Sequence, residues 1–458
     1  MQLNGNIASS FRDPSGFIFT QDGHIYRQVN HIYKEHYDHL INSGLYTALV
    51  DAHLLVPHHE SDAQPPEPEN VYKVIQPKVV PFISYPYEWS FSQLKDAAIT
   101  TLQIQLKSLN YGMSLKDCSA YNIQFNQGKP IFIDTLSFEK YREGEPWIAY
   151  RQFCQHFLAP LALMSYTDVR LNQLFRVYID GIPLDLVSFL LPSMSWLKFA
   201  TLFHIHLHAK AQKRFSLRPM PRKTPNVSRS SFLALIENLI SGIERLKWTA
   251  NGTDWGDYYD STCYSDNGFS NKKRLVEEFL EKTNPRMVWD LGSNTGLFSR
   301  IAAARGIQTI CFDLDPGCVE KNYLYCSKNQ ESNILPLVLD LTNPSPNIGW
   351  QNQERMSLVD RGPADVVLAL ALIHHLCISN NVPLKKIAAF FHEITHALII
   401  EFVPPGDTQV QSLLSGNGNL IRNYSQGEFE NAFSQYFYTS NQARLDTSGR
   451  SLYQMHRK

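Results

Sequence analysis

The chain has 458 residues, of which 43% are hydrophobic, and a formal net charge of -1 at pH 7. This length exceeds a single hydrophobic core and predicts two or three globular domains, while the near-zero charge gives no global signal for nucleic acid or for an anionic membrane. Seven cysteines without C-x-x-C spacing, and an amino terminus without the features of a signal peptide, predict a cytoplasmic protein with reduced thiols.

The N-terminal half begins with strand signals. Residues 16–19 and 23–27 each open on a glycine and continue with apolar or aromatic residues, which predicts a short hairpin. Arg27 is the basic residue nearest to the place that a phosphate-binding lysine takes in a nucleotide site. The polar, proline-rich residues 58–70 predict an exposed loop, and residues 92–109 predict a long helix.

The clearest polar pattern of this half is D-x-x-x-x-N, formed by Asp117 and Asn122. A predicted strand over residues 130–133 then ends in Asp134. Phosphotransferases use such a set because one Asp orients the acceptor hydroxyl, while the Asn and the later Asp hold the magnesium that bridges the nucleotide phosphates. The pattern therefore predicts a candidate ATP and magnesium site at these three residues.

The segment from residue 92 to Asp134 resembles the catalytic and metal loops of kinase-like folds, especially the small-molecule phosphotransferase branch. The resemblance implies an α+β kinase-like domain over residues 1–209. Leu115 and Lys116 stand where the family usually carries His-Arg or a His-Gly pair, and Thr135 follows the metal-binding Asp in place of Phe. These departures leave a regulatory or scaffolding pseudokinase, or a helical bundle with incidental acids, as alternatives to phosphotransfer.

An apolar region closes the N-terminal half. Residues 186–203 form the longest apolar stretch, but Pro192 and Lys198 interrupt it, so it predicts buried helices and no membrane span or membrane partner. The alternating histidines of residues 204–208 follow. They lack the spacing of a closed metal site.

Residues 210–230 are predicted to link the two domains. From His208 to Ser231 the sequence holds seven Lys or Arg residues, three prolines and no acid. Such a segment can contact RNA or acidic lipid. Because Phe215 alone interleaves an aromatic ring with these charges, a solvated connector is favoured over nucleic-acid binding.

Residues 231–458 are predicted to form the second domain, which begins with a helical and aromatic leader over residues 231–284. Four aromatic residues of the leader precede a predicted helix over residues 271–282. They predict either a lid over a bound cofactor or packing between the domains. These residues are Trp255, Tyr258, Tyr259 and Tyr264.

The run from Val288 to Gly296 predicts an apolar strand that ends in Asp290 and opens into a turn at Gly292. Glycines in such a turn supply positive φ, or let a ligand approach the backbone where a Cβ would clash. Asn294 replaces the middle glycine that a pyrophosphate requires, and no lysine follows the turn, which argues against a dinucleotide fingerprint and a P-loop. The turn predicts a nucleoside cofactor, S-adenosylmethionine.

Polar or acidic residues also follow the later predicted strands. Asp313 ends the second strand at the offset of a ribose-binding carboxylate, with Asp315 beside it. Asp340 follows the third strand, where it can accept a hydrogen bond from the adenine amino group. The fourth and fifth predicted strands, residues 364–370 and 397–402, lead to the catalytic candidates.

The order of these strand ends makes the region from about Trp255 to the C-terminus similar to class I S-adenosylmethionine-dependent methyltransferases. The resemblance implies an α/β fold with a doubly wound, Rossmann-like sheet of seven strands whose last strand is antiparallel. Two predicted strands near the C-terminus, residues 436–439 and 451–455, agree with this fold. The resemblance assigns cofactor binding to Asp290, Gly292, Asn294, Gly296, Asp313, Asp315, Asp340, Leu341 and Ala371.

Methyl transfer requires a nucleophile aligned with the sulfonium, and a base where that nucleophile carries a proton. His374 and His375 follow the fourth strand, at the sheet edge where the methyl group should point, and histidine titrates near neutral pH. Alternatively, one of the two packs beneath the cofactor. Glu401 is the third catalytic candidate, as a carboxylate that orients the substrate or an imidazole.

A zinc-protease pattern, H-E-x-x-H, occurs from His392 to His396. It lies in the final turn of a predicted helix over residues 384–396 that leads into the fifth strand, and no third ligand is suitably placed. These observations argue against zinc, and no metal is predicted in this domain.

The sequence therefore predicts an S-adenosylmethionine-dependent methyltransferase that acts on an unidentified acceptor, with a small molecule or a glycan favoured. Its N-terminal domain is predicted to select the substrate or to regulate the reaction. A bifunctional or nucleotide-sensing phosphotransferase-like protein and a non-catalytic binding scaffold are the alternatives. The methylated atom and the oligomeric state are not predicted.

Overall fold

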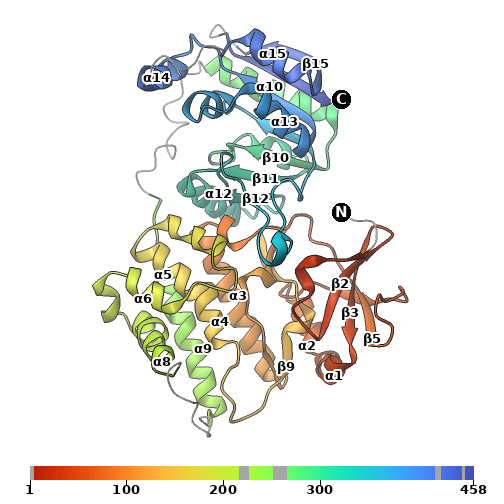
Figure 1. The fold of residues 1–458 in the computed structure, drawn as a ribbon, viewed down its shortest axis with the longest axis vertical. Coiled ribbons are helices and arrows are strands. Elements are labelled where there is room, and N and C mark those ends of the chain that lie inside the picture. Colours follow the sequence, from red (N-terminus) through yellow and green to blue (C-terminus); the bar gives the residue numbers. More distant parts are fainter. Residues whose placement is uncertain (1–4, 216–225, 251–265, 418–423, 446–448) are drawn as a thin grey trace. The chain divides into compact units, whose positions relative to one another are not determined.

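The computed structural model describes residues 5–215, 226–250, 266–417, 424–445 and 449–458. The chain forms two compact units (Figure 1): unit 1 comprises residues 1–249 and 347–355, and unit 2 comprises residues 250–346 and 356–458. Within the described ranges, no helix has both the length and the hydropathy that crossing a bilayer requires.

Unit 1 begins with an antiparallel sheet in the order β1-β2-β3-β5-β4. The predicted hairpin is confirmed, because β2 and β3 pair from Gly16–Val29 to Gln21–His24. Residues 58–60, predicted as part of a loop, instead add an edge strand to this sheet. The strands are β1 (Gly5–Asn6), β2 (Gly16–Gln21), β3 (His24–Asn30), β4 (His58–Glu60) and β5 (Val71–Pro77).

A long helix and two small strand pairs follow. The predicted helix over residues 92–109 is confirmed as α3 (Phe91–Asn110), which starts with a capping box in which Gln93 Oε1 accepts from the Ser90 backbone N–H at 2.9 Å. The pairs are β6 (Met113–Leu115) with β9 (Phe138–Lys140), and β7 (Ile123–Asn126) with β8 (Lys129–Phe132). The D-x-x-x-x-N segment connects β6 to β7.

Among the described residues of unit 1, the other α-helices have nine residues or fewer, except the 16-residue helix Arg229–Glu244. Residues 150–166 are helical throughout, with a π-helical turn at Cys154–Leu158. These helices are α1 (Lys34–Asn42), α2 (Leu45–Asp51), α4 (Tyr150–Phe153), α5 (Ala159–Tyr166), α6 (Leu184–Leu190), α7 (Phe199–Thr201), α8 (His208–Phe215) and α9 (Arg229–Glu244).

The unit boundaries differ from the predicted domain boundaries. Helix α9, predicted as part of the second domain, belongs to unit 1, where it packs on α3. It buries an apolar stripe of Phe232, Ile236, Leu239 and Ile243, and this burial explains the longer first unit. Residues 216–225 of the predicted linker lie outside the described residues, as do all four aromatic residues of the predicted leader.

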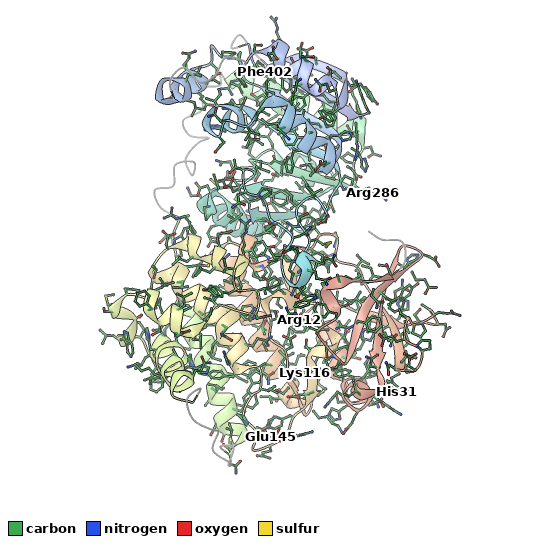
Figure 2. All side chains as sticks on the ribbon, in the orientation of Figure 1. Arg12, His31, Lys116, Glu145, Arg286 and Phe402 are labelled. Atoms are coloured by element: carbon green, nitrogen blue, oxygen red, sulfur yellow. The ribbon has the colours of Figure 1, made fainter. Side chains whose placement is uncertain are left out.

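A second difference concerns residues 347–355, which the sequence places in the second domain but which belong to unit 1. Glu354 is buried there. Arg12, labelled in Figure 2, donates to it from Nη2 to Oε1 at 2.7 Å. The Arg355 guanidinium lies 4.3 Å from the centre of the Tyr121 ring. These pairings join residues far apart in the sequence, so local patterns could not indicate them.

Unit 2 contains one sheet of seven strands in the order β12-β11-β10-β13-β14-β16-β15. The strands from β12 to β14 are parallel, whereas β16 runs antiparallel to both of its neighbours, so the predicted doubly wound α/β fold with an antiparallel last strand is confirmed. The strands are β10 (Met287–Leu291), β11 (Gln308–Asp313), β12 (Ile334–Val338), β13 (Ala364–Ala369), β14 (Thr395–Phe402), β15 (Phe437–Arg444) and β16 (Ser451–Arg457).

Helices flank this sheet. Buried residues of α10, such as Val276 and Leu280, form one core with residues of β10, β13 and β14, such as Val288, Val366 and Ile399. The helices are α10 (Asp266–Thr283), α11 (Ser299–Ala303), α12 (Pro316–Asn329), α13 (Leu384–Ile394), α14 (Thr408–Asn417) and α15 (Gln426–Ser434). Because β10 lies between β11 and β13, the strand order reverses at β10, and the carboxyl edge of a sheet at such a switch point is where open α/β folds bind ligands.

The zinc-protease pattern is divided between two elements. Helix α13 ends at Ile394, two residues before the predicted end, and β14 begins at Thr395. His392 therefore lies on a helix and accepts a hydrogen bond from Arg457 at 3.1 Å, whereas His396 lies in a strand. The two histidines share no helical face, which excludes the H-E-x-x-H zinc geometry.

Candidate functional site

A cavity of about 360 Å³ lies in unit 2 at the carboxyl ends of the parallel strands. It brings together residues from the ends of four strands, β10 to β13, that the sequence separates. The predicted site residues that line it are Asp290, Gly292, Asn294, Asp313, Asp340, Leu341, Ala371 and His375. Four other predicted residues, Gly296, Asp315, His374 and Glu401, do not line it.

The turn after β10 forms the floor of the cavity. Gly292 and Gly296 have φ of +74° and +82°, a conformation that side chains rarely adopt. A Cβ on Gly296 would lie 2.5 Å from Asn322 Nδ2, so this glycine packs against α12 behind the turn. Gly296 thus shapes the turn without reaching the cavity.

Asp313 connects β11 to this turn. Its carboxylate accepts backbone hydrogen bonds from Asn294 at 2.7 Å and from Asp315 at 2.9 Å. Burial raises the pKa of Asp313 to about 6, and these two backbone bonds oppose the rise. Asp313 is therefore a fixed carboxylate on the cavity wall that gains from additional hydrogen-bond donors.

Asp315 has a different role from the one predicted. Its side chain accepts from the Gly317 backbone N–H at 2.7 Å and caps the first turn of α12. Ser, Thr, Asp and Asn are favoured at this helix position because they satisfy free backbone N–H groups. Because Asp315 lies so close to Asp313 in the sequence, this helix-capping residue was predicted to be a second cofactor ligand.

Asp340 is held after β12 by a local turn. Its Oδ1 accepts from the Thr342 backbone N–H at 2.8 Å and from Thr342 Oγ1 at 2.6 Å. Asp340 and Leu341 line the cavity on the β12 side, where Asp313 and Leu314 are also found. One side of the cavity thus presents two carboxylates with apolar neighbours, a combination that suits a nucleoside.

Asp290 lies at the other side of the turn and is 2% exposed. Its carboxylate accepts from Ser299 Oγ at 2.6 Å, and burial raises its pKa to about 6. Lys272 of α10 also lines the cavity, and its charge favours the ionised form of Asp290. An acid and a base therefore border the same end of the cavity.

Lys272 is a cavity residue that the sequence analysis did not predict. Its Nζ lies 2.6 Å from Glu401 Oε2 and 4.6 Å from the centre of the Phe298 ring. Burial lowers the pKa of Lys272, and Glu401 opposes this shift. A signal was present, because Lys272 takes a place on the buried stripe of α10 between Phe269 and Val276, where a lysine is unusual.

Two of the three catalytic candidates do not reach the cavity wall. Glu401 is fully buried and forms ion pairs with Lys272 and with Arg450, whose Nε also lies 2.7 Å from Asp407 Oδ2. His374 is fully buried, and neither ring nitrogen has a hydrogen-bond partner among the residues that the structure describes. Burial and the neighbouring His375 keep the pKa of His374 well below its usual value.

His375 is the catalytic candidate that lines the cavity. Its ring centre lies 4.2 Å from that of His374, which packs behind it. Burial lowers the pKa of His375, so the imidazole is neutral at pH 7 and can accept a proton. The geometry thus assigns different positions to two adjacent histidines that the sequence could not distinguish.

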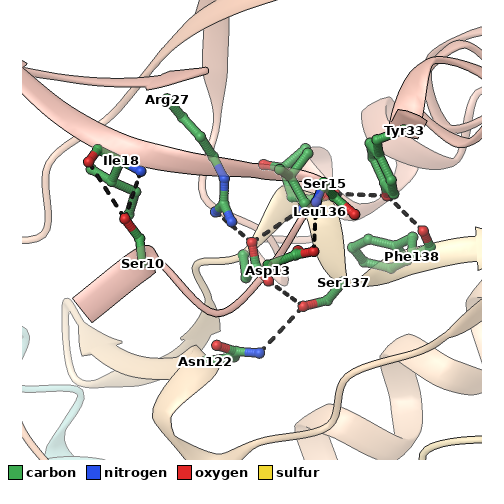
Figure 3. A network of polar contacts seen from close by, with 12 residues as sticks. Ser10, Asp13, Ser15, Ile18, Arg27, Tyr33, Asn122, Leu136, Ser137 and Phe138 are labelled. Carbon is green, nitrogen blue, oxygen red and sulfur yellow. Dashed lines mark hydrogen bonds and ion pairs between the residues drawn. The ribbon is translucent and has the colours of Figure 1, made fainter. Parts of the chain in front are cut away.

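The three predicted residues of the N-terminal site converge in unit 1. Asp117 Oδ1 accepts from Gln152 Nε2 at 2.8 Å, and Asn122 also donates to the Asp117 carboxylate. Asn122 Nδ2 donates in turn to Ser137 Oγ at 3.2 Å (Figure 3), and the Ser137 hydroxyl donates to Asp134. Burial, followed by the charge of Asp134, raises the pKa of Asp117.

Two basic side chains near these residues already have partners within unit 1. Arg27 forms an ion pair with Asp134, and Lys116, labelled in Figure 2, donates from Nζ to Ser15 Oγ at 2.7 Å. Lys116 also lies 3.6 Å from Asp13. Across the described parts of both units, no group of three or more His, Cys, Asp or Glu side chains is placed to hold a metal ion.

Comparison with solved structures gives weak overlaps. Magnesium protoporphyrin IX methyltransferase from Synechocystis PCC 6803, with bound SAH, is 16% identical, covers 42% of this chain and 84% of its own, and has a TM-score of 0.31. PH0226 protein from Pyrococcus horikoshii OT3 is 17% identical, covers 45% of this chain and 100% of its own, and has a TM-score of 0.30. WbdD is 14% identical, covers 45% of this chain and 43% of its own, and also has a TM-score of 0.30. Such TM-scores are too low to establish fold or function.

No protein-family model matches the sequence. In contrast, nodulation protein NoeA of Rhizobium meliloti (strain 1021) is 36% identical to it over 464 residues, an alignment that covers 99% of this chain and 96% of the relative. The alignment thus spans both units of this chain. The chain belongs to the family of nodulation protein NoeA.

Proposed function

We propose that this protein is an S-adenosylmethionine-dependent methyltransferase whose cofactor binds in the cavity of unit 2. The observation that carries the proposal is the convergence of Asp290, Asp313 and Asp340 on one cavity at the switch point of the sheet. Each acid lies at or just after the carboxyl end of a different parallel strand, the edge where open α/β sheets bind nucleosides.

The residues of the cavity fit the two ends of this cofactor. Asp313 and Asp340 can accept hydrogen bonds from ribose hydroxyls and from an adenine amino group, with Leu314, Leu339 and Leu341 as apolar neighbours. The amino acid end carries an ammonium and a carboxylate. Asp290 and Lys272 offer the opposite charges at the other end of the cavity.

The bound cofactor would supply an electrophilic methyl group, and the protein would position the acceptor and remove its proton. His375 is the proposed base, because it lines the cavity as a neutral imidazole. His374 holds the His375 ring from behind, and the buried pair of Lys272 and Glu401 fixes the cavity wall below. His374 and Glu401 are positioning residues in this proposal.

The acceptor is a small molecule or a glycan in this proposal, and unit 1 selects it or regulates the reaction. Because the relative is named a nodulation protein, we propose a role in the same process. Incubation of a cell extract with methyl-labelled S-adenosylmethionine tests the proposal by mass spectrometry. Label should appear in one acceptor with the native protein and at least ~100-fold less with His375→Asn, the range that general bases contribute. Equal labelling by both proteins would contradict the role of His375, and no labelling by either would contradict methyl transfer.

A second candidate function, nucleotide sensing by unit 1, is favoured by the convergence of Asp117, Asn122 and Asp134. Magnesium binding there requires Asp134 to exchange its ion pair with Arg27 for the metal. Thermal-shift titration with ATP and magnesium tests this candidate against Asp134→Asn. A shift in the native protein that the variant lacks would support it, and equal shifts would contradict it.

A further inference from the structure

Six large apolar side chains of unit 1 are exposed between Phe189 and Leu207, with exposed fractions from 40% to 84%. Single exposed apolar residues are common on protein surfaces, but a group of this density in one short segment marks an interaction surface. We call this group the apolar patch. It consists of Phe189, Met194, Leu197, Phe199, Phe203 and Leu207.

The apolar patch lies on segments that pack on one another. Phe199 and Phe203 are one helical turn apart, and their ring centres lie 4.4 Å from each other. His206 joins the segments from beneath, because its Nδ1 lies 2.7 Å from Ser188 Oγ of α6 and its Nε2 lies 2.8 Å from Ser195 Oγ. Ser188 precedes Phe189, and Ser195 lies between Met194 and Leu197 in the sequence. His206, one of the alternating histidines, thus supports the patch.

Cations border the same surface. Lys198 is exposed between Leu197 and Phe199, and Lys210 of α8 places its Nζ 4.4 Å from the centre of the Trp196 ring. Among the described residues from Asp185 to Lys210, two lysines, Lys198 and Lys210, and one acid, Asp185, are exposed. The net charge of the side chains beside the apolar patch is therefore positive.

We propose that the apolar patch and its basic residues bind the surface of a membrane that contains anionic lipids. Apolar side chains that enter the boundary between headgroups and acyl chains, with cations beside them, are what interfacial binding requires. The positive charge beside the apolar patch favours this occupant over a second copy of the chain, because two copies would bring Lys198 and Lys210 of each chain close together. The proposal departs from the expectation of no membrane partner, which rested on the absence of a predicted spanning segment.

Co-sedimentation with lipid vesicles tests this proposal. The full chain should bind vesicles of phosphatidylcholine with phosphatidylglycerol at least about tenfold more tightly than vesicles of phosphatidylcholine alone, and added salt should weaken the binding. Met194→Ser/Leu197→Ser should reduce the binding at least about tenfold, because both side chains enter the interface. The matched control, Ile32→Ser/Val79→Ser, changes two exposed apolar residues outside the patch and should bind as the native protein does.

Near-ultraviolet circular dichroism shows whether each variant keeps its native packing. If Met194→Ser/Leu197→Ser fails to fold, Lys198→Glu/Lys210→Glu replaces it and should reduce only the binding to anionic vesicles. Equal binding to both vesicle types, no binding, or native binding by the folded patch variants would overturn the proposal. It would also be overturned if sedimentation velocity showed that the patch substitutions dissociate a dimer, or if a single-stranded RNA competed fully with the vesicles.

Discussion

The two units each gather three polar residues that the sequence separates, yet they leave these residues in different states. In unit 2, Asp290 and Asp313 line a cavity and have pKa values raised to about 6 by burial. In unit 1, Asp134 is paired with Arg27, and Asp117 accepts hydrogen bonds from Gln152 and Asn122.

A raised pKa is common to both sites, because burial also raises the pKa of Asp117. The difference is access: Asp290 and Asp313 face a cavity that a ligand can enter, whereas Asp134 is paired with Arg27 and Asp117 is bonded to Gln152. A buried carboxylate with a raised pKa is destabilised in its ionised form, and donors from a ligand relieve that cost. A carboxylate that is already paired with a cation of the protein gains less stability from the donors of a ligand. The comparison therefore favours cofactor binding in unit 2 and a structural or regulatory role for the network of unit 1.

The largest expected effect comes from Lys272→Met. Because this substitution removes a cation from beside the buried Glu401, we expect the free energy of unfolding to fall by about 3 kcal/mol, measured by urea titration. Lys272→Met/Glu401→Gln should recover at least half of the loss, and Lys273→Met, on the same helix, should lose little. Equal losses from Lys272→Met and Lys273→Met would show that the buried pair does not stabilise unit 2.

The same variant sharpens the assignment of the cavity. If Lys272 holds the carboxylate of the cofactor, the native protein should bind S-adenosylhomocysteine more tightly than methylthioadenosine, which lacks the amino acid end. In Lys272→Met/Glu401→Gln that preference should disappear. An unchanged preference, measured by calorimetry, would remove Lys272 from the binding site while leaving the cofactor assignment intact.

A smaller effect is expected in unit 1 from Arg27→Met. The substitution leaves Asp134 without its internal cation, and because both side chains are slightly exposed, the loss in stability should be about 2 kcal/mol. Chemical denaturation followed by circular dichroism measures it. Full recovery in Arg27→Met/Asp134→Leu would confirm that the pair acts within the protein, whereas no loss in Arg27→Met would show that the pair is not stabilising.

The smallest effect is a pH dependence of cofactor affinity. Asp290 and Asp313 have pKa values near 6 against an ordinary 3.8, so the folded protein without cofactor binds more protons than the unfolded chain and loses stability as the pH rises from about 4 to about 6. Cofactor donors favour the ionised carboxylates. Each carboxylate that must ionise on binding should therefore weaken the affinity for S-adenosylhomocysteine about tenfold from pH 7 to pH 5, and a flat calorimetric profile would exclude both carboxylates from the binding site.

Local sequence patterns predicted the features that depend on residues close together in the sequence. The glycine turn and Asp313 could be found because parallel strands place their carboxyl ends at one edge of a sheet. Asp117, Asn122 and Asp134 could be predicted as one group because they lie close together in the sequence. Two short strand pairs then bring them together in the fold.

Pairings between distant segments could not be predicted. The ion pair of Lys272 and Glu401 joins α10 to β14, and that of Arg12 and Glu354 assigns residues 347–355 to unit 1. Neither has a fixed spacing in sequence. Burial decided between His374 and His375, which have identical side chains and adjacent positions.

Calorimetric titration with S-adenosylhomocysteine tests the central claim most directly. The native protein should bind it with one site per chain, and Asp313→Ala should abolish the binding, while Asp315→Ala, which removes a helix cap outside the cavity, should retain it after correction for the folded fraction. Equal affinity in the native protein and Asp313→Ala, or no binding by the native protein, would contradict the assignment of the cavity.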